Sequence, residues 1–174
     1  MESALSADKR REERYVALME ASPVSKTNVV TEEVTVRGTA AGFLQQVDVG
    51  KFHFAVDEPL AVGGTATAPD PYDYLLAGLG ACTSMTVGLY ARSKKFPLET
   101  IQVTLRHSRI HATDCENCET TIGMLDRIDL DLQLTGNMTP EQRAKLIEIA
   151  GKCPVHRTLK SEIDIRIQEK PAQR

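Results

Sequence analysis

Two cysteines, Cys82 and Cys153, stand in sequence surroundings that could support thiol chemistry. Cys153 follows Gly151, which is expected to end one helix, and precedes Pro154, a residue favoured in the first turn of the next. This order predicts a helix N-cap at Cys153, where free backbone N–H groups and the helix dipole favour a thiolate. Cys82 lies among small apolar residues, where a buried structural thiol is the alternative to a reactive one. Taken singly, each cysteine leaves both roles open.

The other two cysteines belong to a second constellation, which comprises His107, His111, Cys115 and Cys118. Imidazole and thiolate ligands suit a tetrahedral zinc site, so the segment is a candidate zinc site. A second redox-active pair is an alternative, because Cys-x2-Cys motifs also carry reactive thiols. An ordinary loop between two strands is the third reading, since the spacing matches no known zinc module.

Composition and charge favour a cytoplasmic protein of one compact domain. The chain has 174 residues and a formal net charge of −3, without a long block of Lys and Arg, which argues against a nucleic-acid partner. The first 14 residues are charged and lack the apolar stretch of a signal peptide, so free thiols in a reducing compartment are expected. The longest apolar stretch, residues 74–90, is short for a membrane span and is read as a buried helix.

The elements that must position the thiols begin with a long central helix from about residue 72 to residue 94. Its apolar residues surround it on most sides, which predicts a helix covered by sheet or by a second subunit. Gly78, Gly80 and Gly88 within it indicate that something packs close to its backbone. A helical extension over residues 1–27 precedes the main domain, which is expected to span residues 28–170.

Strands are predicted on both sides of this helix. Three precede it, and Gly50-Lys51 between two of them indicates a type II′ hairpin. Two follow it, then a helix opened by Thr139 and Gln142 as a capping box, and a final strand is expected at Ile163 to Ile167. The order β-β-β-α-β-β-α-β predicts an α+β fold with antiparallel sheets.

The two cysteine segments together resemble one known family. Residues 71–83, Pro-Tyr-Asp-Tyr-Leu-Leu-Ala-Gly-Leu-Gly-Ala-Cys-Thr, closely resemble the cysteine-bearing helix of the OsmC/Ohr family. Residues 153–159, Cys-Pro-Val-His-Arg-Thr-Leu, resemble the second cysteine segment of one OsmC branch. Asp57-Glu58-Pro59 followed by Gly63-Gly64 also fits the pattern of that branch. The likeness covers roughly residues 31–168.

This resemblance implies an intertwined homodimer, in which sheets from both chains wrap two long central helices. It implies thiol-dependent reduction of hydroperoxides, with Cys82 attacking the peroxide and Cys153 resolving the resulting sulfenic acid as a disulfide. The partners would be a second copy, a hydroperoxide and a dithiol reductant, with no membrane and no required cofactor. The alternative is a protein that holds a small ligand in an apolar pocket, with cysteines that are inert or slow.

One departure from the family pattern concerns the charged groups around the thiol. Family members carry a glutamate ten residues before the helix cysteine, where it orients an active-site arginine; this chain has Tyr72 there. Asp73 is adjacent but lies about 100° round the helix. Arg37 is the candidate for the arginine. This departure predicts a peroxidase that is slower than typical members of the family.

Overall fold

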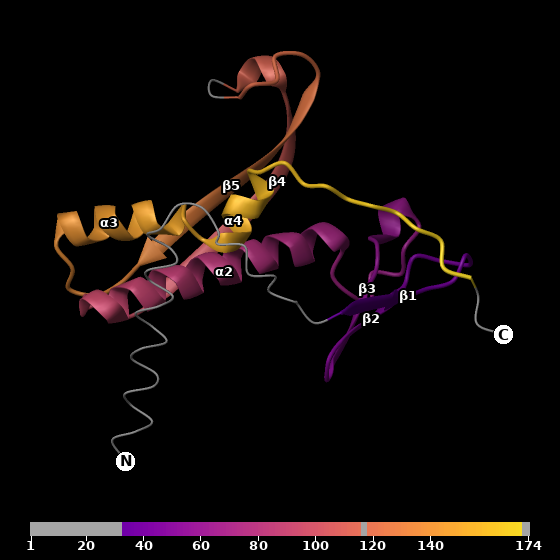
Figure 1. Ribbon diagram of the computed structural model, residues 1–174, viewed down its shortest axis with the longest axis horizontal. Coiled ribbons are helices and arrows are strands. Elements are labelled where there is room, and N and C mark those ends of the chain that lie inside the picture. The colour runs from indigo at the N-terminus through magenta and orange to yellow at the C-terminus, as the bar shows by residue number, and fades with distance from the viewer. Residues whose placement is uncertain (1–32, 116–117, 172–174) are drawn as a thin grey trace.

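The computed structural model describes residues 33–115 and 118–171 (Figure 1). The elements follow in the order β1 (Val34–Arg37), β2 (Gln45–Val49), β3 (Phe52–Val56), the 3-10 helix η1 (Leu60–Val62), α2 (Pro71–Lys94), β4 (Ile101–His111), the 3-10 helix η2 (Ala112–Asp114), β5 (Met124–Leu134), α3 (Pro140–Ala150) and α4 (Pro154–Leu159). The expected α+β class is confirmed. The helix predicted within residues 1–27 lies outside the described residues.

The strands form two separate antiparallel sheets. One is three-stranded, in the order β1-β2-β3, and the other is the long hairpin β4-β5. Gly50, at the tip of the β2-β3 hairpin, has a φ of 55°, a left-handed conformation that glycine adopts at little cost. This agrees with the predicted hairpin, since a type II′ turn needs positive φ only at its first central residue.

Helix α2 is the central element of the fold. Asp70 is its N-cap and forms a capping box with Asp73, and Lys95 ends it in a left-handed conformation. It packs on β4, α3 and α4. A Cβ on Gly80 would stand 2.7 Å from Leu105 on β4, so the predicted close approach to the helix backbone is confirmed there.

The core lies where the C-terminal half of α2 meets α3 and the inner face of the β4-β5 hairpin. Its buried members are Val87, Tyr90, Ala91, Met138, Leu146, Ile149 and Ala150. Thr139 and Gln142 form the predicted capping box that starts α3, and Arg143 donates to the backbone oxygens of Leu134 and Gly136. These bonds hold α3 against the end of β5. They thereby fix the position of the turn that joins α3 to α4.

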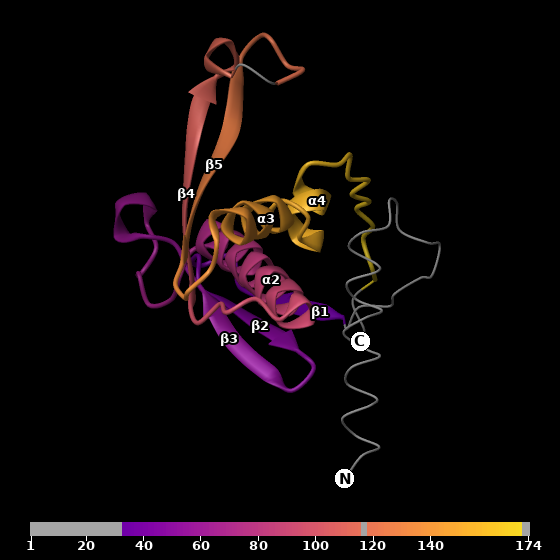
Figure 2. The ribbon, with the colours of Figure 1, turned by 90° about the vertical axis from the view of Figure 1, so that its left-hand side faces the viewer.

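The three-stranded sheet stands apart from this core, at the N-terminal end of α2 (Figures 1 and 2). Tyr74 on α2 reaches it by donating to the backbone oxygen of Ala55 at 2.7 Å and by packing on Phe54. Val34, Val36 and Phe52 on its strands are exposed. The sheet is therefore attached to the rest of the chain mainly at one corner.

The prediction of a final strand at Ile163 to Ile167 is wrong for the single chain. Residues 162–171 have no regular secondary structure, and Ile165 and Ile167 are 79% and 95% exposed. A strand must pair its backbone with a neighbour, and no strand of the described residues takes this segment as a partner. The isoleucines do alternate with polar residues, as a strand would require. Within one chain, however, their side chains have no surface on which to pack.

Candidate functional site

The two thiols that the sequence singled out lie together, where α4 packs against α2. Cys82 occupies the middle of α2, and Cys153 occupies the N-cap of α4, as predicted. The side chains of Cys82 and Cys153 interact directly, and neither is in a disulfide. The fold thus joins two cysteines that are 71 residues apart.

Cys153 is fully buried and receives two hydrogen bonds at its sulfur. The backbone N–H of His156 donates to Cys153 Sγ at 3.2 Å, which is the N-cap bond of α4. The hydroxyl of Thr83, on the turn of α2 that carries Cys82, donates to the same sulfur at 3.5 Å. Both donors are oriented to stabilise negative charge on this sulfur. The sequence had not singled out Thr83, because nothing in its local spacing links it to a residue 70 positions away.

Cys82 is half-buried and has a different electrostatic environment. Burial raises the pKa of the Cys82 thiol, and the neighbouring Cys153 side chain raises it further. The backbone N–H of Val155, in the first turn of α4, opposes this shift by donating toward the Cys82 sulfur. The balance leaves Cys82 a weaker acid than a free cysteine, so a cation from outside the described chain would be needed to activate it strongly.

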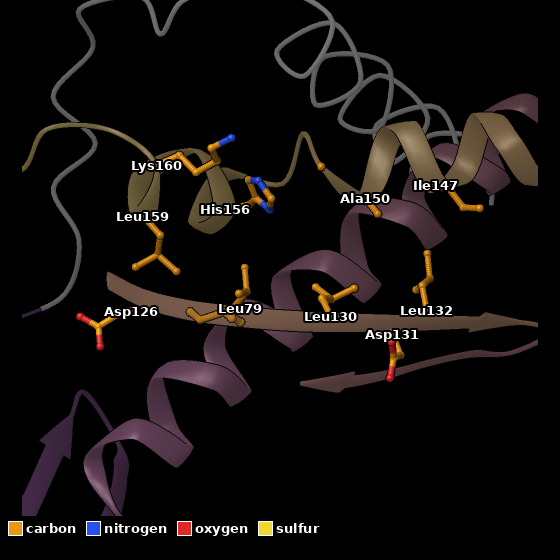
Figure 3. Close-up of a pocket in the computed structure, with 12 residues that line it drawn as sticks. Leu79, Asp126, Leu130, Asp131, Leu132, Ile147, Ala150, His156, Leu159 and Lys160 are labelled. Carbon is orange, nitrogen blue, oxygen red and sulfur yellow. The ribbon is translucent and has the colours of Figure 1, made fainter. Parts of the chain in front are cut away.

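A cavity of about 640 Å³ lies beside this junction, between α2, α3, α4 and β5 (Figure 3). Leu79, one turn before Cys82, and Gly151, two residues before Cys153, form part of its wall. The rest is mostly apolar, from Leu130 and Leu132 on β5 and Ile147 on α3. Neither thiol lines the cavity itself. It is a hollow adjacent to the thiol pair.

His156 and Lys160 bring polar groups to the α4 side of the cavity (Figure 3). Burial lowers the pKa of His156, and the charge of Lys160 adds to the effect. The imidazole is therefore mainly neutral at pH 7, and it can either donate or accept a hydrogen bond.

A family model described as OsmC-like protein matches residues 64–168, a range that includes Cys82 and Cys153. The chain belongs to the OsmC-like family. No curated protein matches the sequence. The resemblance read from the cysteine segments is thereby confirmed at the level of the family.

Solved structures of this family share the fold. An OsmC-like protein from Mycoplasma pneumoniae superposes with a TM-score of 0.60 at 22% identity, covering 76% of this chain and 89% of that one. An organic hydroperoxide resistance protein OsmC from Legionella pneumophila gives 0.58 at 20% identity, covering 79% and 95%. An organic hydroperoxide resistance protein from Elizabethkingia anophelis gives 0.56 at 26% identity, covering 80% and 94%.

The charged residues assigned to the OsmC-like site do not meet the thiols within this chain. Arg37 is on β1, where it pairs with Asp48 on β2. The carboxylate of Asp73 accepts from the backbone N–H of Asp70 and so completes the cap of α2. Tyr72, at the position of the family glutamate, stacks on His107 of β4 with ring centroids 4.4 Å apart.

The four candidate zinc ligands are not gathered into one cluster. Cys115 and Cys118 are joined by a disulfide. His107 Nε2 lies 3.0 Å from Asp126 Oδ1, and His111 is exposed at the end of β4. Among the residues that the structure describes, no group of three or more His, Cys, Asp or Glu side chains is arranged to hold a metal. In this oxidised arrangement the sulfurs of Cys115 and Cys118 are bonded to each other, so they do not act as zinc ligands.

Proposed function

We propose that the protein is a thiol-dependent peroxidase that reduces hydroperoxides through Cys82 and Cys153. The observation that carries the proposal is the contact between two free thiols from different elements, one in a long helix and one at a helix N-cap. The names of the Legionella and Elizabethkingia relatives, organic hydroperoxide resistance proteins, support a role in peroxide detoxification.

The chemistry needs both sulfurs. The Cys82 thiolate attacks the terminal oxygen of the hydroperoxide, the O–O bond breaks, and the alkoxide leaves and takes a proton, which gives a sulfenic acid on Cys82. Cys153, already in contact, then attacks that sulfur and releases water as the disulfide forms. A dithiol reductant restores both thiols. The N–H of His156 and the hydroxyl of Thr83 donate to the Cys153 sulfur and would hold it in place for this second attack.

Two single variants test this division of labour. Cys82→Ser should abolish peroxide consumption, because the attacking sulfur is gone. Cys153→Ser should consume about one equivalent of peroxide, then stall and over-oxidise, because the sulfenic acid cannot be resolved. Stopped-flow mixing with an organic hydroperoxide and mass spectrometry of Cys82 measure both effects. The Cys115→Ser/Cys118→Ser double variant is the matched control and should keep wild-type turnover.

A second candidate function rests on the cavity. Its volume of about 640 Å³ and its apolar walls fit a small organic ligand, which a protein could hold without redox chemistry. Two measurements distinguish these functions. A ligand-binding protein would not react with hydroperoxides but would bind apolar fluorescent ligands. Leu130→Trp, which fills the cavity, should then abolish that binding, and the ligand-binding function would replace the peroxidase.

A further inference from the structure

The protein holds two cysteine pairs in different redox states. Cys115 and Cys118 form a disulfide, whereas Cys82 and Cys153 are free thiols. The disulfide lies at the far end of the β4-β5 hairpin, next to η2, and the thiols lie at the α2-α4 junction; both ribbon views keep the two places well apart (Figures 1 and 2). The disulfide is therefore a site of its own, outside the proposed peroxidase site.

Closing the hairpin is a poor explanation for this disulfide. Strands β4 and β5 already pair from Ile101 and Leu134 at one end to His111 and Met124 at the other. Beyond them, the N–H of Ala112 donates to the oxygen of Gly123 at 2.8 Å. A bond that closes a four-residue segment also removes less chain entropy than one that closes a long loop. The hairpin needs little further help to stay closed.

The disulfide is open to attack by an incoming thiol. Both cysteines line a hollow of about 460 Å³, with apolar walls from Ile110 and Leu125 and charged groups from Asp114 and Arg127. Cys118 is exposed, whereas Cys115 is half-buried. Thiol–disulfide exchange requires access to one of the two sulfurs, and Cys118 is the more exposed residue of the pair.

One of the two candidate histidines, His107, is held by other contacts. His107 already has two partners, the carboxylate of Asp126 and the ring of Tyr72 on α2. A Cys-x2-Cys disulfide with an accessible sulfur suits reversible redox exchange, and a four-ligand zinc site would need His107 to leave both contacts.

We propose that Cys115 and Cys118 form a second redox site, a dithiol–disulfide pair that exchanges two electrons with a dithiol donor. A thiolate of the donor attacks Cys118 Sγ, the S–S bond breaks, and Cys115 leaves as a thiolate that takes a proton. The second thiol of the donor then attacks its own sulfur in the mixed disulfide, which releases Cys118. The donor ends as a disulfide, and the pair ends with two protons and two electrons.

The full-length Cys82→Ser/Cys153→Ser variant isolates this site, because the chain has four cysteines. It would be equilibrated with graded ratios of reduced and oxidised dithiothreitol, quenched with acid, and alkylated for mass spectrometry. Both cysteines should become alkylated together in a single two-electron transition, while circular dichroism shows a folded chain throughout. A pair that stays unreactive until denaturant is added would overturn the proposal. So would two thiols that are free without reductant and accompanied by about one zinc per chain.

The direction of attack has its own test in the same background. With Cys115→Ser, the remaining Cys118 should react with an aromatic disulfide reagent roughly tenfold faster than Cys115 does in the Cys118→Ser variant, because access controls the rate. Equal rates, or the reverse order, would contradict the assignment of Cys118 as the attacked sulfur. Neither test uses peroxide, so the outcome is independent of the proposed peroxidase activity.

Discussion

At the scale of single residues, the site depends on two placements, Cys153 at the N-cap of α4 and the contact between Cys153 and Cys82 on α2. The N-cap position of Cys153 followed from Gly151 and Pro154, two residues whose backbone preferences are strong and local. The contact between the thiols did not follow from any spacing, because it depends on how α4 docks on α2. The family resemblance supplied the pairing, and the roles of the two sulfurs remain predictions.

A pH dependence follows from the environment of Cys82. Burial raises the pKa of this thiol, so only a small fraction is thiolate near pH 7, and that fraction grows about tenfold per pH unit below the pKa. In Cys153→Ser, the single-turnover rate with an organic hydroperoxide should therefore keep rising between about pH 6 and about pH 8. Stopped-flow measurements in a series of buffers would show this slope. A plateau that is reached below pH 7 would instead reveal a cation near Cys82 in the assembled protein.

At the scale of elements, the loop that joins β3 to α2 has a structural role that the sequence did not predict. Residues 57–70 carry the Asp57-Glu58-Pro59 and Gly63-Gly64 patterns, which the sequence offered only as family markers. In the structure, Asp57 Oδ2 is buried and accepts from the backbone N–H and the hydroxyl of both Thr65 and Thr67. A Cβ on Gly64 would collide with the backbone of Glu58. These contacts fold the loop on itself and deliver Asp70 to the N-cap of α2.

Asp57→Asn should loosen this loop, because a neutral amide oxygen holds the four donors more weakly than the charged carboxylate oxygen does. The midpoint of thermal unfolding at pH 7 should fall, on the order of 5 °C. Differential scanning calorimetry measures it. Glu162→Gln removes an exposed carboxylate instead and should leave the midpoint unchanged. An equal midpoint for Asp57→Asn and wild type would contradict a structural role for this carboxylate.

The same carboxylate predicts an acid dependence of stability. Hydrogen bonds from Thr65, followed by those from Thr67 and Glu58, hold the pKa of Asp57 well below its usual range. A carboxyl whose pKa is depressed on folding stabilises the protein above its unfolded pKa of about 3.9, and this stabilisation is lost as the pH falls. Wild type should therefore lose stability more steeply than Asp57→Asn below about pH 4. Parallel curves of unfolding midpoint against pH would contradict this.

At the scale of the whole molecule, the sequence predicted the central helix, the five antiparallel strands around it and the capped helix that follows them, because these depend on local periodicity and capping. It failed at Ile163 to Ile167, where the pattern of a strand is present but a pairing partner is not. The same cause explains the exposed sheet of β1 to β3. Local sequence encodes surfaces that must be covered, but it does not say whether the cover comes from the same chain.

One side of α2 carries a further uncovered surface, and Cys82 lies along it. Met85 is 71% exposed, and apart from the nearby backbone of α2 itself no atom of the described residues lies within 4 Å of the position of a Cβ on Gly78. Gly78, Cys82 and Met85 are four and three residues apart, which puts them on one face of the helix. We infer that a second copy of the chain covers this face, the β1-β3 sheet and the isoleucine segment, as the family resemblance implied. In that assembly the thiol pair would lie at the subunit interface.

An obligate homodimer is therefore the expected state, and the isoleucine segment offers a sharp test. Light scattering at micromolar concentration should give twice the mass of one chain. Ile165→Lys places a charge where apolar contact is expected, so it should weaken association roughly 10- to 100-fold, a cost typical of burying a charge without a partner. Glu162→Lys introduces a lysine three residues earlier, where it replaces a charged, exposed side chain and not an apolar one. It should therefore leave the dimer intact. A monomeric wild type would contradict the dimer, and equal effects of the two lysines would remove this segment from the interface.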